Sequence, residues 1–366
     1  MRTIFFLKDS FILYYDNVIM AAAMLLFVCV VLMLYGSSGG RKRELLFYIP
    51  VSLLFSIVCS RLLYWFCHQE QFAGVRSAFQ DFFTTGYCMT GVLLGTLLAA
   101  ALAKLCHVTR KVWRLLDSVG VATCFAFGCI RLSALFNETC RGKIPAPVEA
   151  FPLGATITNA LGEQEYRFAT FMVESGLYFL GFVILLCIFI ALYYGKKKAG
   201  KRKKRVGNVY RLSLVVTGSI ALIMDSTRYD SCFMPFNGFV SLVQILAAVS
   251  ALVAMILLFA RKIRNAGVSA GKIMTLLGFV ILVGAVAYTE YLIQRHGDWY
   301  KNCYMGMGAA CLGMNILAFF MSKSAKTAGE KPLVEVEESE IKQPKELGST
   351  EEKTVTPDTI VIQELD

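Results

Sequence analysis

Charged residues are scarce in this chain. Asp, Glu, Lys and Arg make up 17% of its 366 residues, whereas 56% are hydrophobic, and the mean hydropathy is +0.58. A soluble domain of this length would not be so apolar. Histidine is scarcer still, because the only three are His68, His107 and His296, and none lies in the middle of an apolar segment. A proton relay through a membrane that is built on histidine is therefore not expected.

Several motifs of metal- and nucleotide-dependent proteins are also missing. The sequence has no Walker phosphate loop and no His-Glu-x-x-His motif. Its twelve cysteines include no Cys-x-x-Cys pair, so we predict no zinc site, no redox centre and no cofactor. Most cysteines fall in apolar segments, where they act as small hydrophobic residues. Four are expected near the outer face, where a disulfide could form although spacing does not show one: Cys67, Cys140, Cys232 and Cys303.

What the chain does contain is a series of apolar segments of about 20 residues, which is the length that crosses a bilayer as a helix. We place nine of them, at 17–35, 44–67, 84–105, 114–136, 170–194, 207–225, 237–260, 272–293 and 302–321. The predicted fold is therefore an all-α, polytopic bundle of transmembrane helices. Residues 138–167 form the largest predicted external loop, and their Pro and Gly content predicts turns and a short hairpin.

One loop orients the predicted bundle. Eight of the ten residues in 196–205 (KKKAGKRKKR) are basic, and Lys and Arg concentrate in cytoplasmic loops. Basic loops recur at every second position, which places the N-terminus outside and the C-terminus in the cytoplasm. The net charge of the whole chain is +11, and its positive charge lies in these loops, where membrane orientation and anionic lipids explain it, so no nucleic-acid partner is expected. The tail 323–366 is acidic and lacks aromatic residues, so we predict that it is disordered.

A few ionisable residues lie inside or at the ends of these segments, where charge is costly and often marks a functional site. Arg131 has apolar residues on both sides, and its planar guanidinium suits a phosphate. Arg61 ends the second segment and could instead be an interfacial anchor. Glu174 could pair with an arginine across the bundle, for structure or for function. Asp225 and Arg228 are three residues apart on one helical face, so a simple ion pair at the membrane surface is the alternative there.

Glycines recur in the third segment (TGYCMTGVLLG), at Gly86, Gly91 and Gly95. Small residues at this spacing usually let two helices approach closely. They would also let a lipid come near the backbone.

Taken in order, several pieces of the chain resemble the bacterial prolipoprotein diacylglyceryl transferases. The segment ILYYDNVIM resembles the aromatic–Tyr start of that family's first span, with Tyr15 at the Tyr position. CSRLLYWF is similar to the Gly-Arg-Leu-x-Tyr element and supplies Arg61 and Tyr64. TGYCMTGVLLG resembles the Gly-rich His-Gly-Gly segment.

The most specific resemblance is LLDSVGVATCFAFGCIRLSALFNETCRG, which is similar to the family signature. The matching residues there are Asp117, Gly128, Arg131, Asn137 and Gly142. RFATFMVES resembles the His-Pro-Thr-Gln-Leu-Tyr-Glu element, and TGSIALIMDSTR resembles Tyr-Gly-x-x-Arg-Phe-x-x-Glu-x-x-Arg. These two keep Thr170, Glu174, Gly218, Asp225 and Arg228, and Gln244 matches a Gln in the family's last span.

The chain departs from the family pattern at several positions. The family's His in the third span is Thr90 here, the Asn after the signature Arg is Ala134, and the first Arg of the sixth-span element is Ala221. The His-Pro pair before the fifth span is Phe168-Ala169.

The resemblance covers residues 10–260. It implies a seven-span transferase-like domain at 1–262, two additional spans at 263–322 and the acidic tail at 323–366.

The resemblance also implies an activity, namely transfer of a diacylglyceryl group from phosphatidylglycerol to the thiol of a lipobox cysteine in the bacterial plasma membrane. The implied partners are a phospholipid and a lipobox-containing prolipoprotein. Catalytic roles are implied for Arg131, Glu174 and Asp225, and substrate-binding roles for Tyr15, Arg61, Gly91, Asn137 and Arg228. Two alternatives stay open, which are a relative that binds lipid or lipoprotein precursor without transfer and an unrelated transporter.

Overall fold

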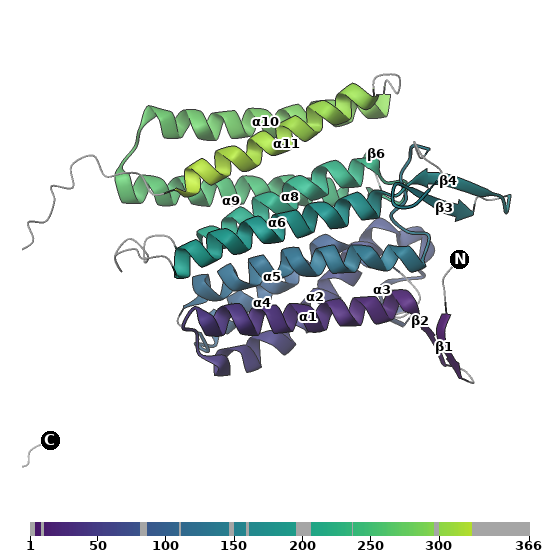
Figure 1. Cartoon of the computed structure of the whole chain (residues 1–366), viewed down its shortest axis with the longest axis horizontal. Helices are drawn as coiled ribbons and strands as arrows, with labels where there is room; N and C mark the ends of the chain where they lie inside the picture. The colour runs from purple at the N-terminus through teal and green to yellow at the C-terminus, as the bar shows by residue number, and fades with distance from the viewer. Residues whose placement is uncertain are drawn as a thin grey trace, which may run out of the picture. The chain divides into compact units, whose positions relative to one another are not determined.

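Nine long helices dominate the part of the chain that the computed structural model describes (Figure 1), which is residues 4–8, 11–80, 86–109, 111–145, 150–158, 161–194, 206–235, 237–295 and 300–323. Eight are long and apolar enough to cross a membrane, and the ninth is an apolar helix of 17 residues. The predicted all-α, polytopic bundle is confirmed. The Lys-rich run 196–205, His296 and all but the first residue of the tail lie outside the described residues.

The helices follow the predicted spans closely. They are α1 (Tyr15–Ser37), α2 (Lys42–Cys67), α4 (Met89–Leu105), α5 (Val112–Leu132), α6 (Thr170–Tyr193), α8 (Asn208–Thr227), α9 (Leu242–Ala266), α10 (Ala270–Arg295) and α11 (Tyr300–Ser322). The short helix α3 (Val75–Gln80) follows a 3-10 turn at Gln69–Gln71, and a second 3-10 turn, Ser133–Phe136, continues α5.

Two predicted starts are wrong by five residues each, and local structure explains the start of α9. Helix α9 begins at Leu242 rather than at 237, because strand β6 (Asn237–Ser241) precedes it. Ser241 caps the helix, since its hydroxyl accepts a hydrogen bond from Val243 N at 3.2 Å and its own N–H donates to Gln244 Oε1 at 3.4 Å. This capping box satisfies two otherwise unpaired helix donors. Helix α4 starts at Met89, after Cys88 in extended conformation, rather than at 84.

Among the described residues, three short hairpins lie at one end of the helices (Figure 1). They pair β1 (Ile4–Lys8) with β2 (Phe11–Tyr14), β3 (Gly154–Thr158) with β4 (Gln164–Phe168), and β5 (Phe233–Met234) with β6, all antiparallel. The hairpin predicted within 138–167 is therefore confirmed, and its register runs from Gly154 opposite Phe168 to Thr158 opposite Gln164.

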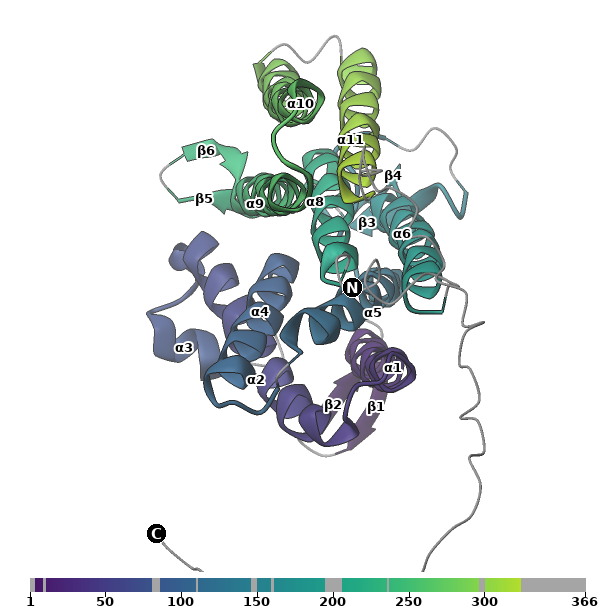
Figure 2. The ribbon, with the colours of Figure 1, turned by 90° about the vertical axis from the view of Figure 1, so that its left-hand side faces the viewer.

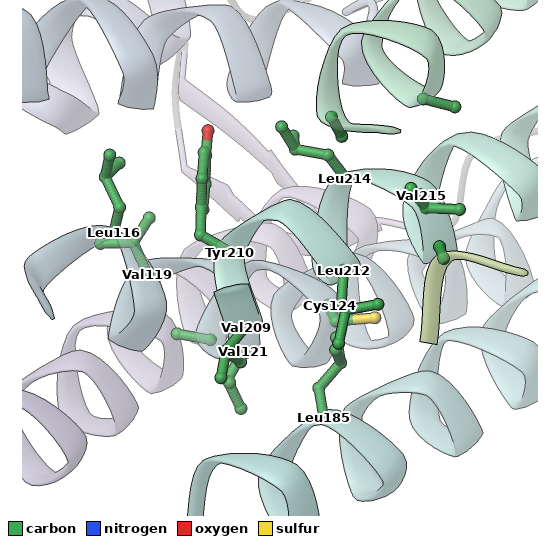
Figure 3. Packing of buried hydrophobic residues seen from close by; sticks show 14 of the residues in the cluster. Leu116, Val119, Val121, Cys124, Leu185, Val209, Tyr210, Leu212, Leu214 and Val215 are labelled. Atoms are coloured by element: carbon green, nitrogen blue, oxygen red, sulfur yellow. The ribbon is translucent and has the colours of Figure 1, made fainter. Parts of the chain in front are cut away.

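Helices α5 and α8 form the centre of the bundle. In Figure 2, α10 and α11 lie beyond them on the side of α8 and α9, and α1, α2 and α4 lie on the other side. Apolar side chains from α5, α6 and α8 meet there, among them Cys124, Leu185 and Leu212 (Figure 3). Helix α10 instead exposes large apolar residues along its length, as expected for a surface that faces lipid.

The glycines of α4 serve packing against α2. A Cβ on Gly91 would lie 2.3 Å from Ser60 Cα, and one on Gly95 would lie 2.3 Å from Ser56 N. Both serines donate hydrogen bonds to carbonyls of the α4 segment, at 2.6 Å to Cys88 O and 3.3 Å to Val92 O. Glycine thus permits close contact between the two backbones, as the spacing predicted.

Asp117 joins α5 to α6 and to the start of α8, at the end of the bundle opposite the hairpins. Its Oδ2 accepts hydrogen bonds from the Tyr193 hydroxyl at 2.9 Å and from Gly207 N at 2.6 Å, and its Oδ1 accepts one from Tyr210 N at 2.9 Å. Gly207 is the residue that precedes α8. A carboxylate from α5 therefore caps the N-terminus of α8, where the helix dipole favours negative charge.

Candidate functional site

Three helix ends converge near the hairpins and bring four of the predicted site residues together. Arg131 lies in the last turn of α5, Glu174 near the start of α6, Asp225 in the last turn of α8, and Arg228 one residue beyond that helix. Their charges interact with one another in this buried cluster. Residues that are far apart in sequence thus form one polar centre within the bundle.

Arg131 and Glu174 form an ion pair across α5 and α6. Arg131 Nε lies 2.8 Å from Glu174 Oε1, and the two side chains are 12% and 2% exposed. Arg131 Nη1 also donates to Cys140 Sγ at 3.2 Å. The other carboxylate oxygen, Glu174 Oε2, is buried and has no hydrogen-bond partner within the described part of the chain. The predicted pairing of Glu174 with an arginine is confirmed.

The ion pair that spacing suggested between Asp225 and Arg228 is not formed within the described structure. Arg228 Nε instead lies 3.0 Å from Asp230 Oδ1, because α8 ends at Thr227 and Arg228 has an extended backbone. Asp225 is 3% exposed, and its Oδ2 lacks a hydrogen-bond partner among the described residues. Glu174 and Asp230 each form an ion pair with an arginine, whereas Asp225 forms none among the described residues.

Asp230 holds two parts of the site. Its second oxygen, Oδ2, accepts a hydrogen bond from Cys140 N at 2.9 Å. Burial works to raise the pKa of Asp230, but the Arg228 guanidinium outweighs it and the pKa lies below its ordinary value. Burial has the opposite effect on a cation and would lower the pKa of Arg228. Cys140 and the nearby carboxylates outweigh burial and hold that pKa well above its usual range. Both groups therefore stay charged at neutral pH.

Cys140 lies between the two arginines in a left-handed backbone conformation, with φ of 56°. A non-glycine residue in this region is strained and needs support from its surroundings. The Cys140 N–H donates a hydrogen bond to Asp230, and the Cys140 sulfur accepts one from Arg131. These two contacts supply that support. Burial raises the pKa of the Cys140 thiol, although Arg228 and Arg131 act against it, so the sulfur here is an acceptor and not a thiolate nucleophile.

Arg141 is a third buried arginine that the sequence reasoning missed. Its Nη2 donates to Asn137 O at 2.9 Å, its Nε donates to Thr156 O at 3.4 Å, and its guanidinium lies 4.5 Å above the Phe171 ring. Its Nη1 is buried with no partner in the described structure. The available signal was its position directly before Gly142 at the end of the signature.

Several of the buried polar atoms that lack a hydrogen-bond partner in the described structure lie around this centre. Besides Glu174 Oε2, Asp225 Oδ2 and Arg141 Nη1, the Thr170 hydroxyl is buried without a partner among the described residues. An unpaired buried polar atom costs about 1–3 kcal/mol. A ligand with several hydroxyl or phosphate oxygens would satisfy these donors and acceptors, so the arrangement suits a polar headgroup.

Tyr15 and Asn137 lie beside the centre and support it. The Tyr15 ring stacks on Phe136 at 5.1 Å, and Asn137 Nδ2 donates to Asp16 Oδ2 at 3.2 Å. Asn137 Oδ1 accepts a hydrogen bond from Thr139 N at 3.0 Å. These contacts position the loop that carries Cys140 and Arg141, and the predicted substrate role of both residues remains a prediction.

Arg61 forms a separate cluster. It is fully buried, donates to Ala78 O at 2.7 Å and Gly86 O at 2.8 Å, and lies 5.4–5.9 Å from three aromatic rings, those of Tyr64, Phe72 and Tyr87. Within the described ranges no contact joins it to Arg131. The guanidinium is thus held inside the protein, and both the anchor interpretation and the substrate-binding role of Arg61 remain predictions. Gly91 is closely packed on Ser60, as described above, and its substrate role also stays a prediction.

The departures from the family pattern have plain environments. The Thr90 hydroxyl contacts the Cys88 sulfur at 3.0 Å. Ala134 is buried in the turn after α5, and Ala221 is half-buried in α8. None of the three side chains can accept a proton from a thiol or hold a phosphate charge.

Two comparisons with known proteins bear on this site. The family model described as prolipoprotein diacylglyceryl transferase matches residues 3–260, which include every charged residue of the polar centre. A phosphatidylglycerol–prolipoprotein diacylglyceryl transferase of Symbiobacterium thermophilum is 31% identical over 195 residues, which are 51% of this chain and 65% of that protein. The aligned part thus spans less than two thirds of the relative's length, and α10 and α11 lie beyond the family match.

Proposed function

Because this chain belongs to the prolipoprotein diacylglyceryl transferase family, we propose that it moves a diacylglyceryl group from phosphatidylglycerol to the thiol of a lipobox cysteine. Its location would be the bacterial plasma membrane, with a phospholipid and a prolipoprotein as partners. The observation that carries the proposal is the buried Arg131–Glu174 pair beside Arg228, at three converging helix ends. The unpaired polar atoms around it support a ligand with a polar headgroup.

The proposed reaction makes two demands on the site. A carbon–sulfur bond forms between the thiol and the glycerol carbon, the carbon–oxygen bond to phosphate breaks, and glycerol phosphate leaves. The thiol must lose its proton, because the thiolate is the nucleophile. The phosphate must be held and its developing charge neutralised.

Arginines meet the second demand. Arg228 Nε contacts Asp230, and among the described residues neither terminal nitrogen of its guanidinium has a partner that would compete with phosphate oxygens. Arg131 contacts Glu174 through Nε and Cys140 through Nη1, so within the same residues Nη2 is available. Planar guanidinium groups bind phosphate through paired hydrogen bonds. Glu174 would then act mainly by orienting Arg131.

A carboxylate must meet the first demand, because Thr90 occupies the position of the family's His and cannot act as a base. Asp225 is the better candidate, since Arg131 neutralises Glu174 directly whereas Asp225 makes no ion pair within the described residues. We assign proton acceptance to Asp225.

A second function has one specific observation in its favour. Three of the family's polar positions are Thr90, Ala134 and Ala221 here, whereas the Arg131 centre is complete. A relative that binds a lipid headgroup without transferring the lipid would need the arginines and not the base.

The two proposals separate in one experiment. The purified full chain is placed in vesicles that contain phosphatidylglycerol, a lipobox peptide with a free cysteine is added, and mass spectrometry measures the diacylglyceryl adduct. We expect the adduct with the unmodified protein and a loss of at least about 100-fold with Arg131→Ala. Arg167→Ala removes an exposed arginine paired with Glu165 and should leave the yield unchanged.

If no adduct forms and phosphatidylglycerol co-purifies with the unmodified chain but not with Arg131→Ala, the transferase proposal is wrong and the lipid-binding function holds. If Arg131→Ala forms adduct at the full rate, the assignment of Arg131 is wrong.

A further inference from the structure

Three cysteines from different elements meet near the hairpins, apart from the Arg131 centre. Cys67 is the last residue of α2, Cys88 precedes α4, and Cys232 lies between α8 and β5. Cys67 Sγ lies 3.8 Å from Cys232 O. The pKa of the Cys232 thiol responds to both Cys67 and Cys88, and that of Cys88 responds to Cys232, so the three side chains are near neighbours. We call these three residues the thiol cluster.

The thiol cluster joins two parts of the bundle. Cys67 and Cys88 belong to the tightly packed α2–α4 pair, where Cys88 N donates to Ser60 O at 3.1 Å. Cys232 belongs to the other part, because its carbonyl accepts a hydrogen bond from Leu242 N at the start of α9, at 2.8 Å. Helix α2 and strand β5 are in contact here. A covalent bond at this point would link α2 to the segment between α8 and α9.

Cys67 and Cys88 are the two candidates for a covalent bond with Cys232, and they differ in how far their side chains are exposed to solvent. Cys88 is 2% exposed, and its sulfur is engaged with Thr90. Cys67 and Cys232 are only partly buried, so a reagent from outside reaches them first. The loop orientation predicted from basic residues places this end of the bundle outside the cell, where disulfides form and persist.

We propose that Cys67 and Cys232 form a disulfide that fastens the C-terminal end of α2 to the segment between α8 and β5. The oxidant is an external disulfide, either a small-molecule disulfide or the disulfide form of a thiol oxidoreductase. The Cys67 sulfur attacks the oxidant and releases one of its thiols, and the Cys232 sulfur then displaces the second. Two S–H bonds and the oxidant's S–S bond are replaced by the new S–S bond and two S–H bonds on the oxidant.

Cys67 is the attacking sulfur because Cys232 is a poor one. Hydrogen bonding to Cys67 and burial raise the pKa of the Cys232 thiol to about 12. Cys232 is therefore protonated at neutral pH and acts in the second step, when the mixed disulfide lies beside it.

This disulfide would restrain the segment that begins with Arg228 and Asp230. Cys232 is two residues beyond Asp230, which holds both Arg228 and the Cys140 backbone. A link at Cys232 therefore limits the movement of one side of the polar centre. This restraint would act whichever reaction that centre performs.

The test uses the full chain in membranes, treated with oxidised glutathione, alkylated, digested and analysed for linked peptides by mass spectrometry. We expect a peptide that joins Cys67 to Cys232, present in the unmodified chain and in Cys88→Ser and absent from Cys67→Ser and Cys232→Ser. Cys106→Ser removes an exposed thiol after α4 and is the matched control, in which the link should remain.

Complete alkylation of both Cys67 and Cys232 after oxidation would overturn the proposal, as would a link between Cys88 and Cys232. Two different single variants that lose the link protect the conclusion against misfolding of either one. A second readout is thermal unfolding, because the linked protein should have a higher midpoint than the same protein after reduction with dithiothreitol. Equal midpoints with the linked peptide present would overturn the fastening role.

Discussion

Glu174 Oε1 lies 2.8 Å from Arg131 Nε, and this contact joins α5 to α6 in a region where both side chains are shielded from solvent. Breaking a buried ion pair by removing one partner leaves an uncompensated charge and costs about 3–5 kcal/mol. The contact is therefore structural as well as a candidate part of the reaction.

Glu174→Gln should consequently lower the thermal unfolding midpoint of the detergent-solubilised protein by several degrees, since about 3–5 kcal/mol of stability is lost. The matched control is Glu165→Gln, which removes the acidic partner of the exposed Arg167 and should cost at most about 1 kcal/mol. Equal midpoints for the two variants would mean that the buried pair contributes no more than a surface pair.

Asp225→Asn keeps the size of the side chain and removes its charge. If Asp225 accepts the thiol proton, kcat should fall by about 100-fold or more, whereas the KM for phosphatidylglycerol should change little. Initial rates of adduct formation at several lipid contents measure both quantities. Glu70→Gln, an exposed carboxylate after α2, is the control. A variant with unchanged kcat would exclude Asp225 as the base.

Gly91→Ala tests the close packing of α2 and α4. The added methyl would lie 2.3 Å from Ser60 Cα, and overpacking of this kind costs about 1–3 kcal/mol. The control is Gly176→Ala in α6, where a Cβ meets nothing within 4 Å and alanine should stabilise the helix by about 0.5–1 kcal/mol. Thermal unfolding should therefore move in opposite directions for the two variants, and a shared direction would contradict the packing role.

The lowered pKa of Asp230 predicts that the stability of the folded protein depends on pH. Its pKa in the folded protein is depressed mainly by Arg228, against the effect of burial, so the ionised form contributes stability above the unfolded pKa of about 3.9. That contribution is lost as pH falls through the lower, folded pKa. The stability difference between the unmodified protein and Asp230→Asn should thus be constant from pH 5 to 7 and shrink below about pH 4. A difference that grows on acidification would reverse this sign.

Asp117→Ala should destabilise the start of α8 specifically. It leaves Gly207 N, Tyr210 N and the Tyr193 hydroxyl without their acceptor, at about 1–3 kcal/mol for each donor. Hydrogen exchange should accelerate in the first turn of α8. Thr123→Ala removes a buried hydroxyl of α5 that bonds only within its own helix and should leave that exchange unchanged. Equal exchange rates in both variants would argue against the cap.

The membrane helices were predictable because hydropathy over 20 residues depends only on composition. The pairing of Glu174 with an arginine was predictable as well, since a buried charge inside a bundle needs a partner. The partner of Arg228 was not, because spacing on a helix applies only while the helix continues, and α8 ends at Thr227. Arg141 and the place of Cys140 in the polar centre were not predictable, because their burial depends on a loop that the hairpin and the segment after α8 enclose.

Tyr304 of α11 donates a hydrogen bond to Ser226 O at 3.2 Å, one residue from Asp225. The side of α8 next to this carboxylate is therefore covered by protein and not by acyl chains. A lipid that reaches Asp225 from the bilayer has to come past another flank of the bundle. Helix α11, which lies beyond the family match, thus covers one side of α8 and leaves fewer directions from which a lipid would reach Asp225.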